Sequence, residues 1–117
     1  MSIDIDLCID TGHPDGPVSV IEVGNYTHNC QPMWSHALKE TGAKITHLCD
    51  FYDMSANEAY PMLQRAFNHM NNPKNRETYE AMNPENGWGD FVTAREYLRK
   101  FTEACGDHPK CTIRTSC

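Results

Sequence analysis

Apolar and polar residues alternate at the beginning of the chain. The apolar positions of this segment are Ile3, Ile5, Leu7 and Ile9. A period of two predicts a β-strand with one buried face. The turn-forming residues of segment 11–17 end this strand, and a second apolar run over 18–23 predicts a strand paired with it as a hairpin.

Apolar residues then recur at intervals of three and four. Pro32 suits the first position of a helix, and Gly42 suits its end. The predicted buried face of this helix is Met33, Trp34, Ala37, Leu38 and Thr41. Segment 44–49 can be read either as a short strand or as an extended connector.

Three further helices and a closing strand follow. Ser55 to Glu58 form a capping box, but Pro61 conflicts with it, so we expect the helix to begin nearer Asn57. Its predicted buried face is Ala59, Met62, Leu63, Ala66, Phe67 and Met70. Segment 71–73 ends it and opens a short helix that carries Tyr79 and Met82.

The last helix has the clearest pattern. Asp90 is its expected N-cap, and Gly106 is the expected left-handed C-cap. Its buried face is predicted to be Phe91, Ala94, Leu98, Phe101 and Cys105. Segment 111–115 predicts a strand that returns to the hairpin. Together these elements predict one α+β domain over residues 1–117, a small antiparallel sheet packed against about four helices.

Charge and composition limit the classes of function. The 117 residues include 16 acidic and 10 basic ones, for a net charge of −6, and the basic residues are scattered. This distribution disfavours nucleic-acid binding. The chain contains no apolar run of membrane length and its first residues do not resemble a secretory signal, so we expect no membrane partner and a cytoplasmic location.

The six cysteines, Cys8, Cys30, Cys49, Cys105, Cys111 and Cys117, are loosely spaced. In a cytoplasmic protein most of them are expected to be reduced thiols. Cys8 and Cys105 lie on apolar faces, where cysteine acts as a small hydrophobic residue.

The first candidate site is a polar segment between the second strand and the Pro32 helix. It comprises Asn25, Tyr26, Thr27, His28 and Asn29. Helix N-termini offer unpaired N–H donors that suit phosphate or carboxylate groups. The alternative is that Thr27 and Asn29 only cap the helix and that His28 is a surface residue.

The second candidate site is segment 83–90, directly before the last helix. Asn83 and Asn86 are polar, and Trp88 stands between two glycines. The glycines allow close backbone approach, and the indole could stack on a planar ring. The alternative is a tight turn that buries Trp88. If both helices begin on the same side of the sheet, the two segments form one pocket.

Metal binding and catalysis are weaker alternatives. The sequence Thr-His-x-Cys occurs twice, which gives His28, Cys30, His47 and Cys49 as candidate zinc ligands, and Cys105, His108 and Cys111 are spaced by threes. Both groups lack the short Cys-x-x-Cys knuckles of structural zinc sites. His28 is the candidate acid or base if the protein is an enzyme, but we do not expect an enzyme, and no cofactor is expected.

The motifs NYTHN, with Met33, and NPENGWG resemble those of a group of small bacteriophage-encoded proteins of unassigned function. The resemblance extends over most of the chain, and Cys30 and Cys49 are not part of its pattern. It implies a phage accessory protein that acts in the host cytosol.

The leading hypothesis is therefore a ligand-binding protein, expected to be a homo-oligomer, that sequesters a small anionic, nucleotide-derived ligand. Some small phage accessory proteins act as anti-defence sponges, which bind a host immune nucleotide without turning it over. The comparison with this chain rests on the biology of phages and not on a shared fold or motif. One alternative is a small hydrolase or lyase that uses His28 as acid or base. Another is a protein-interaction module that inhibits a host factor.

Overall fold

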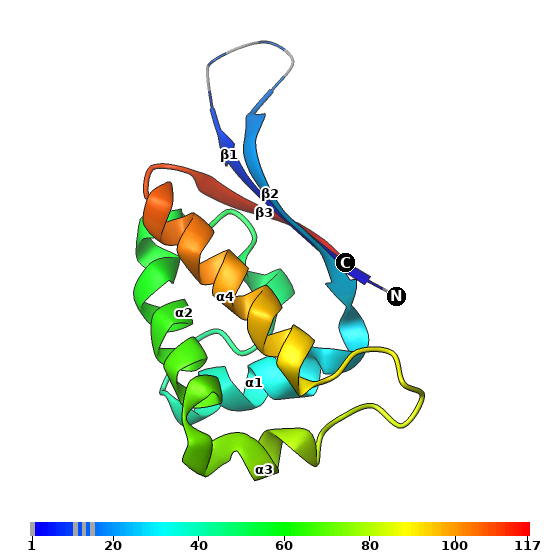
Figure 1. The fold of residues 1–117 in the computed structure, drawn as a ribbon. Helices are drawn as coiled ribbons and strands as arrows, with labels where there is room; N and C mark the ends of the chain where they lie inside the picture. Colours follow the sequence, from blue (N-terminus) through cyan, green and yellow to red (C-terminus); the bar gives the residue numbers. More distant parts are fainter. Residues whose placement is uncertain (1, 11, 13, 15) are drawn as a thin grey trace.

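The computed structural model describes residues 2–10, 12, 14 and 16–117, and its elements follow the expected order (Figure 1). The strands are β1 (Ser2–Ile9), β2 (Val18–Thr27) and β3 (Thr112–Ser116), and the α-helices are α1 (Gln31–Glu40), α2 (Ala56–Asn71), α3 (Arg76–Glu80) and α4 (Phe91–Asp107). Short 3-10 helices are η1 (His28–Cys30), η2 (Leu48–Phe51) and η3 (Pro73–Asn75). The turn residues Thr11, His13 and Asp15 lie outside the described part.

The three strands form one antiparallel sheet in the order β2-β1-β3. The predicted α+β fold, with an N-terminal hairpin and a returning C-terminal strand, is confirmed. Ile3, Ile5 and Leu7 of β1 are completely buried, as their spacing predicts, whereas Ile9 is exposed. The register of β1 against β2 shifts where Ile5 pairs with Gly24 and Asp6 with Glu22, which leaves Val23 as an extra residue.

The helices pack on one face of the sheet (Figure 1), and α4 contacts α1, α2, β1 and β2. The predicted buried faces of α1, α2 and α4 are confirmed almost in full, although Thr41 and Phe67 are only partly buried. Cys8 and Cys105 are buried, as expected. The beginning of β2 extends past the helices (Figure 1). Val18, Val20 and Ile21 of this strand are exposed.

Segment 44–47 is an extended connector rather than a strand, and it leads into η2. In the described part of the chain no helix is both long and apolar enough to span a bilayer.

Two expectations about helix ends were wrong. Helix α2 begins at Ala56, one residue before the expected Asn57, because the Ser55 hydroxyl accepts the Glu58 N–H at 3.1 Å and this cap outweighs the missing N–H of Pro61. Gly106 is not a left-handed C-cap. It lies inside α4, where it lets the ring of Tyr60 approach: a Cβ at Gly106 would stand 2.8 Å from Tyr60 Cε2.

Candidate functional site

The first polar segment is divided between two elements. Strand β2 continues through Thr27, so Asn25, Tyr26 and Thr27 belong to a strand and not to a loop as expected. The strand extends this far because Ser2, Ile3 and Asp4 of β1 pair with these three residues. His28 and Asn29 begin η1, and the Thr27 hydroxyl accepts the Asn29 N–H at 3.3 Å, which makes Thr27 a helix cap.

Tyr26 is a packing residue at the base of this segment. Its ring packs against Trp34 and stacks on Tyr97, with centroid distances of 5.8 and 5.4 Å. Its hydroxyl hydrogen-bonds the Thr93 hydroxyl and accepts the Asp90 N–H at 3.4 Å. Burial is the main cause that raises the pKa of Tyr26, so the phenol stays protonated at neutral pH.

His28 lies against His47 of the connector. The two Nε2 atoms are 3.1 Å apart, and the ring centroids are 5.1 Å apart. The Cys49 N–H donates to Nδ1 of His47 at 3.1 Å, so the neutral His47 ring carries its proton on Nε2 and can donate to Nε2 of His28. Burial, together with the neighbouring His28, lowers the pKa of His47. The His47 ring is therefore neutral at neutral pH.

Gln31 fixes the connector in place, and the sequence analysis missed it. Its Nε2 donates to the Ser35 hydroxyl at 2.6 Å and to the Thr46 carbonyl at 3.2 Å, and its Oε1 accepts the Leu48 N–H at 3.3 Å. Gln31 is 6% exposed. A glutamine on the buried side of the helix was the feature of the sequence that could have identified it, because buried polar groups need hydrogen-bond partners.

An open hollow of about 460 Å³ lies over this arrangement. It is lined by His28, Asn29, Gln31, Pro32, Ser35 and His47. The sequence analysis placed His28 and Asn29 in the ligand site and His47 only in the metal alternative. Asn25 and Tyr26 line a separate hollow of about 300 Å³ between β2 and α4.

The two cysteines proposed as zinc ligands, Cys30 and Cys49, lie in different places. Cys49 lies beside the histidine pair: one donor atom each from His28, His47 and Cys49 are within 4.8 Å of one another. Cys30 is placed elsewhere, because its thiol contacts the Tyr26 hydroxyl and the Asp90 carbonyl, both at 3.9 Å. The expected grouping of Cys30 with these ligands is therefore wrong, since its side chain faces the N-terminus of α4.

Cys49 forms a disulfide with Cys117 across 68 residues of sequence. The expectation that most of the six cysteines are reduced thiols agrees with the structure, and this pair is the exception. The other four, Cys8, Cys30, Cys105 and Cys111, are free and buried. Burial is the main cause that raises the pKa of Cys30, so its thiol is not activated as a nucleophile.

The second polar segment reaches the first one through Gly89. A Cβ at this glycine would stand 2.7 Å from Thr27 Cγ2 and 2.8 Å from Cys30 Sγ, and its φ is +96°. The glycine is therefore required for the close approach. Both segments lie at the end of the molecule where β2 joins α1 (Figure 1).

Trp88 is not buried in a turn: it is 68% exposed. The oxygens of the two asparagines in this segment are used locally, since Asn83 Oδ1 accepts the Phe91 N–H at 2.8 Å and Asn86 Oδ1 accepts the Trp88 N–H at 3.0 Å. For a ligand, Asn83 and Asn86 therefore offer the N–H donors of their side-chain amides.

The N-terminus of α4 already holds an anionic group. The Asp90 carboxylate accepts the Thr93 N–H and the Thr93 hydroxyl, both at 2.8 Å, and these bonds lower its pKa. This confirms Asp90 as the N-cap. It also means that donors for an external anion must come from the η1 side of the site and not from the first turn of α4.

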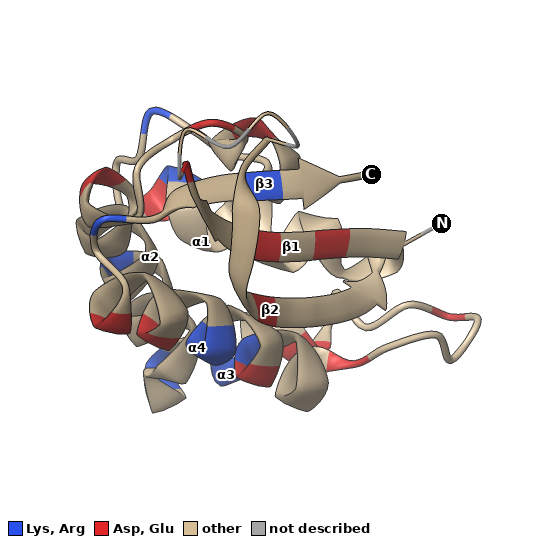
Figure 2. Cartoon of the chain, turned by 90° about the horizontal axis from the view of Figure 1, so that it is seen from above, with Lys and Arg blue, Asp and Glu red and all other residues tan. Residues whose placement is uncertain are grey.

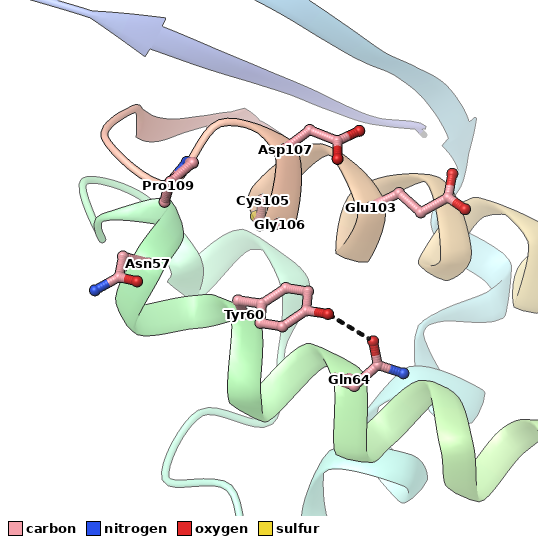
Figure 3. A pocket seen from close by; sticks show the side chains of 8 residues that line it. All are labelled: Asn57, Tyr60, Gln64, Glu103, Cys105, Gly106, Asp107 and Pro109. Carbon is pink, nitrogen blue, oxygen red and sulfur yellow. Dashed lines mark hydrogen bonds between the residues drawn. The ribbon is translucent and has the colours of Figure 1, made fainter.

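A third hollow, of about 320 Å³, lies between α2 and α4 (Figure 3). Tyr60 donates its hydroxyl to Gln64 Oε1 at 3.2 Å along one wall, and Glu103 and Asp107 of α4 form the other. The described lining of this hollow contains none of the residues predicted for the ligand site.

Figure 2 shows acidic and basic residues spread over the strands and helices without a basic array.

The fold and the site together define a small α+β protein with a polar site at one end. Comparison with known proteins finds that no protein-family profile matches the chain and that no solved structure matches it. A stretch of 49 residues is 31% identical to the ORF8 protein of severe acute respiratory syndrome coronavirus 2. The match covers 42% of this chain and 40% of ORF8. This similarity to a viral protein agrees with the expectation of a viral origin.

Proposed function

We propose that the protein binds and sequesters a small anionic, nucleotide-derived ligand at the end of the molecule that carries His28 and Trp88. In this proposal it is a bacteriophage anti-defence protein. The observation that supports it is the close approach of Gly89 to Thr27 and Cys30, which brings together the two polar segments that the sequence singled out separately.

The available groups fit such a ligand. His28 and Asn29 line the open hollow, and they offer ring and amide donors to phosphate or ribose oxygens. Trp88 is exposed and can stack on a base, a contact worth about 1–3 kcal/mol. An anion near the His28–His47 pair favours ring protonation, so binding should strengthen as the pH falls.

Calorimetry against cyclic dinucleotides and ADP-ribose derivatives tests the proposal. The chain is kept oxidised and a chelator is present, so that bound metal cannot contribute. We expect His28→Ala and Trp88→Ala each to weaken binding by about 10- to 100-fold. The matched surface controls His108→Ala and Val92→Ala should bind as the unmodified chain does. Folded protein that binds no member of the panel contradicts the proposal.

One observation favours a second candidate, a small hydrolase or lyase. The lowered pKa of His47 keeps that ring neutral beside His28, and a neutral imidazole can accept a proton from a substrate. Chromatography of the ligand after incubation distinguishes the two functions, because a binding protein returns it intact. Under the enzyme hypothesis, His28→Ala abolishes turnover.

A homo-oligomer is part of the proposal. The exposed Val18, Val20 and Ile21 of edge strand β2 support it, since apolar edge strands favour pairing with another chain. Light scattering of the purified chain gives the subunit number directly.

A further inference from the structure

We propose that the reduced chain binds one Zn²⁺ ion through His28, His47, Cys49 and Cys117, and that formation of the Cys49–Cys117 disulfide releases it. Two imidazoles and two thiolates form a four-ligand set that suits tetrahedral zinc. The four side chains come from η1, the connector, η2 and the segment after β3, and the fold brings them to one place.

The histidine pair already has the spacing of two zinc ligands. Nitrogen ligands at about 2.0–2.1 Å from a tetrahedral ion are about 3.3 Å apart. The observed distance between the two Nε2 atoms is 3.1 Å. The Cys49 sulfur completes a group of three donor atoms within 4.8 Å of one another, so three ligands already converge in the metal-free fold.

Cys117 supplies the fourth ligand. Its sulfur is bonded to that of Cys49, and the two Cα atoms are 6.4 Å apart. Two thiolates on one tetrahedral zinc lie about 3.8 Å apart, given Zn–S bonds of about 2.3 Å. Once the S–S bond is broken, rotation of the two side chains provides this separation.

The chemistry of loading balances with a dithiol reductant. The reductant is oxidised to its own disulfide as the S–S bond of Cys49 and Cys117 breaks and both sulfurs become thiols. Zn²⁺ then displaces one proton from each thiol, so two protons leave for each ion bound. Release is the reverse: an oxidant such as a disulfide takes two electrons from the two thiolates, and the ion departs.

The ring of His47 must change its proton position on loading. Its Nδ1 accepts the Cys49 N–H, so in the metal-free chain the ring proton is on Nε2. Zinc on Nε2 moves that proton to Nδ1, and the Cys49 N–H gives up its bond to the ring. The resulting change at the Cys49 amide is a specific signature of loading.

The other group of cysteine and histidine residues lacks this geometry. Cys105 and Cys111 are buried in the core, and within the described ranges only His28, His47 and Cys49 form a group of converging donors. The zinc site shares His28 with the proposed ligand site but does not depend on it. Ligand binding is measured on the oxidised chain and zinc binding on the reduced chain, so either proposal can fail alone.

The test is titration of the reduced chain with Zn²⁺ against a chromophoric chelator, together with Co²⁺ substitution. We expect one equivalent bound by the reduced chain, visible bands of tetrahedral Co²⁺ with a thiolate charge-transfer band, and no comparable binding to the oxidised chain. Cys49→Ser and Cys117→Ser should each weaken Zn²⁺ binding at least about 100-fold. The matched controls Cys30→Ala and His36→Asn should retain it.

A second measurement needs no variant. Bound zinc should protect Cys49 and Cys117 from alkylation, as read by mass spectrometry of the peptides, and the protection should disappear with a chelator. Equal weak binding by the reduced and oxidised chains overturns the proposal. Loss of binding in Cys30→Ala, with binding retained in Cys117→Ser, overturns this assignment of ligands.

Discussion

At the scale of single residues, the protonation of His47 sets a pH dependence. Burial and His28 lower its pKa below the ordinary value of 6.5, while Asp50 opposes the shift. Burial and His36 likewise lower the pKa of His69. In both cases the unfolded chain takes up a proton at a higher pH than the folded chain, so the free energy of unfolding must fall as the pH decreases below about 6.5.

Denaturant unfolding at a series of pH values between about 7.5 and 5 measures this effect. We expect stability to fall over this range in the unmodified chain and to fall less in His47→Asn and His69→Asn. A matched variant, His108→Asn, should keep the full pH dependence. Stability that rises towards pH 5 contradicts the assignment of these rings as neutral.

Gly89 is the residue on which the contact between the two polar segments depends. We expect Gly89→Ala to destabilise the protein by about 1–3 kcal/mol, because the added Cβ meets Thr27 and Cys30 at a backbone conformation that suits glycine. Gly87→Ala is the control: its φ is also positive, at +75°, but no atom lies within 4 Å of its Cβ position. Thermal unfolding compares the two, and equal losses contradict the close contact.

At the scale of elements, Gly106 provides a test of how α2 packs against α4. Alanine is a better helix former than glycine by about 1 kcal/mol. We nevertheless expect Gly106→Ala to be destabilising, because its Cβ meets the Tyr60 ring. In a Tyr60→Ala background the same change should be stabilising. A double-mutant cycle in denaturant measures the coupling, and its absence contradicts the packing described.

The sequence predicted most of these elements, because local signals determine them. The spacing of apolar residues gave the buried faces of α1, α2 and α4, and Asp90 marked the start of α4. The errors arose where a tertiary contact decided the outcome. Gly106 serves a close approach to Tyr60, which is not visible in local sequence, and β2 continues through Thr27 because β1 pairs with it.

At the scale of the whole molecule, the candidate site is harder to predict than the fold. The segments of His28 and Trp88 could be selected by their polar composition and their position before helices. The repeated Thr-His-x-Cys pattern grouped His28, His47 and Cys49, and the fold brings these three together. Cys117 could not be predicted to join them, because only the tertiary fold places it beside Cys49. Cys30 was included because it ends the first Thr-His-x-Cys repeat, but its side chain packs elsewhere.

The disulfide should also support the fold as a whole. Chain-entropy arguments for a loop of 68 residues give a stabilisation of about 4 kcal/mol relative to the reduced chain. We expect reduction in the presence of a chelator to lower stability by up to this amount, measured by thermal unfolding. The stability of Cys117→Ser should not respond to reductant. If reduction leaves the stability of the unmodified chain unchanged, the disulfide does not stabilise the fold.

The central claim is that His28 and Trp88 contact the same ligand. The direct measurement is an NMR titration of the ¹⁵N-labelled, oxidised chain with the nucleotide that binds best in calorimetry. The indole N–H of Trp88 and the amides of His28 and Asn29 should shift with one common dissociation constant. The buried indole of Trp34, which donates to the Ala94 carbonyl at 3.0 Å, is an internal control and should not move. Shifts at only one of the two segments, or at neither, contradict the account.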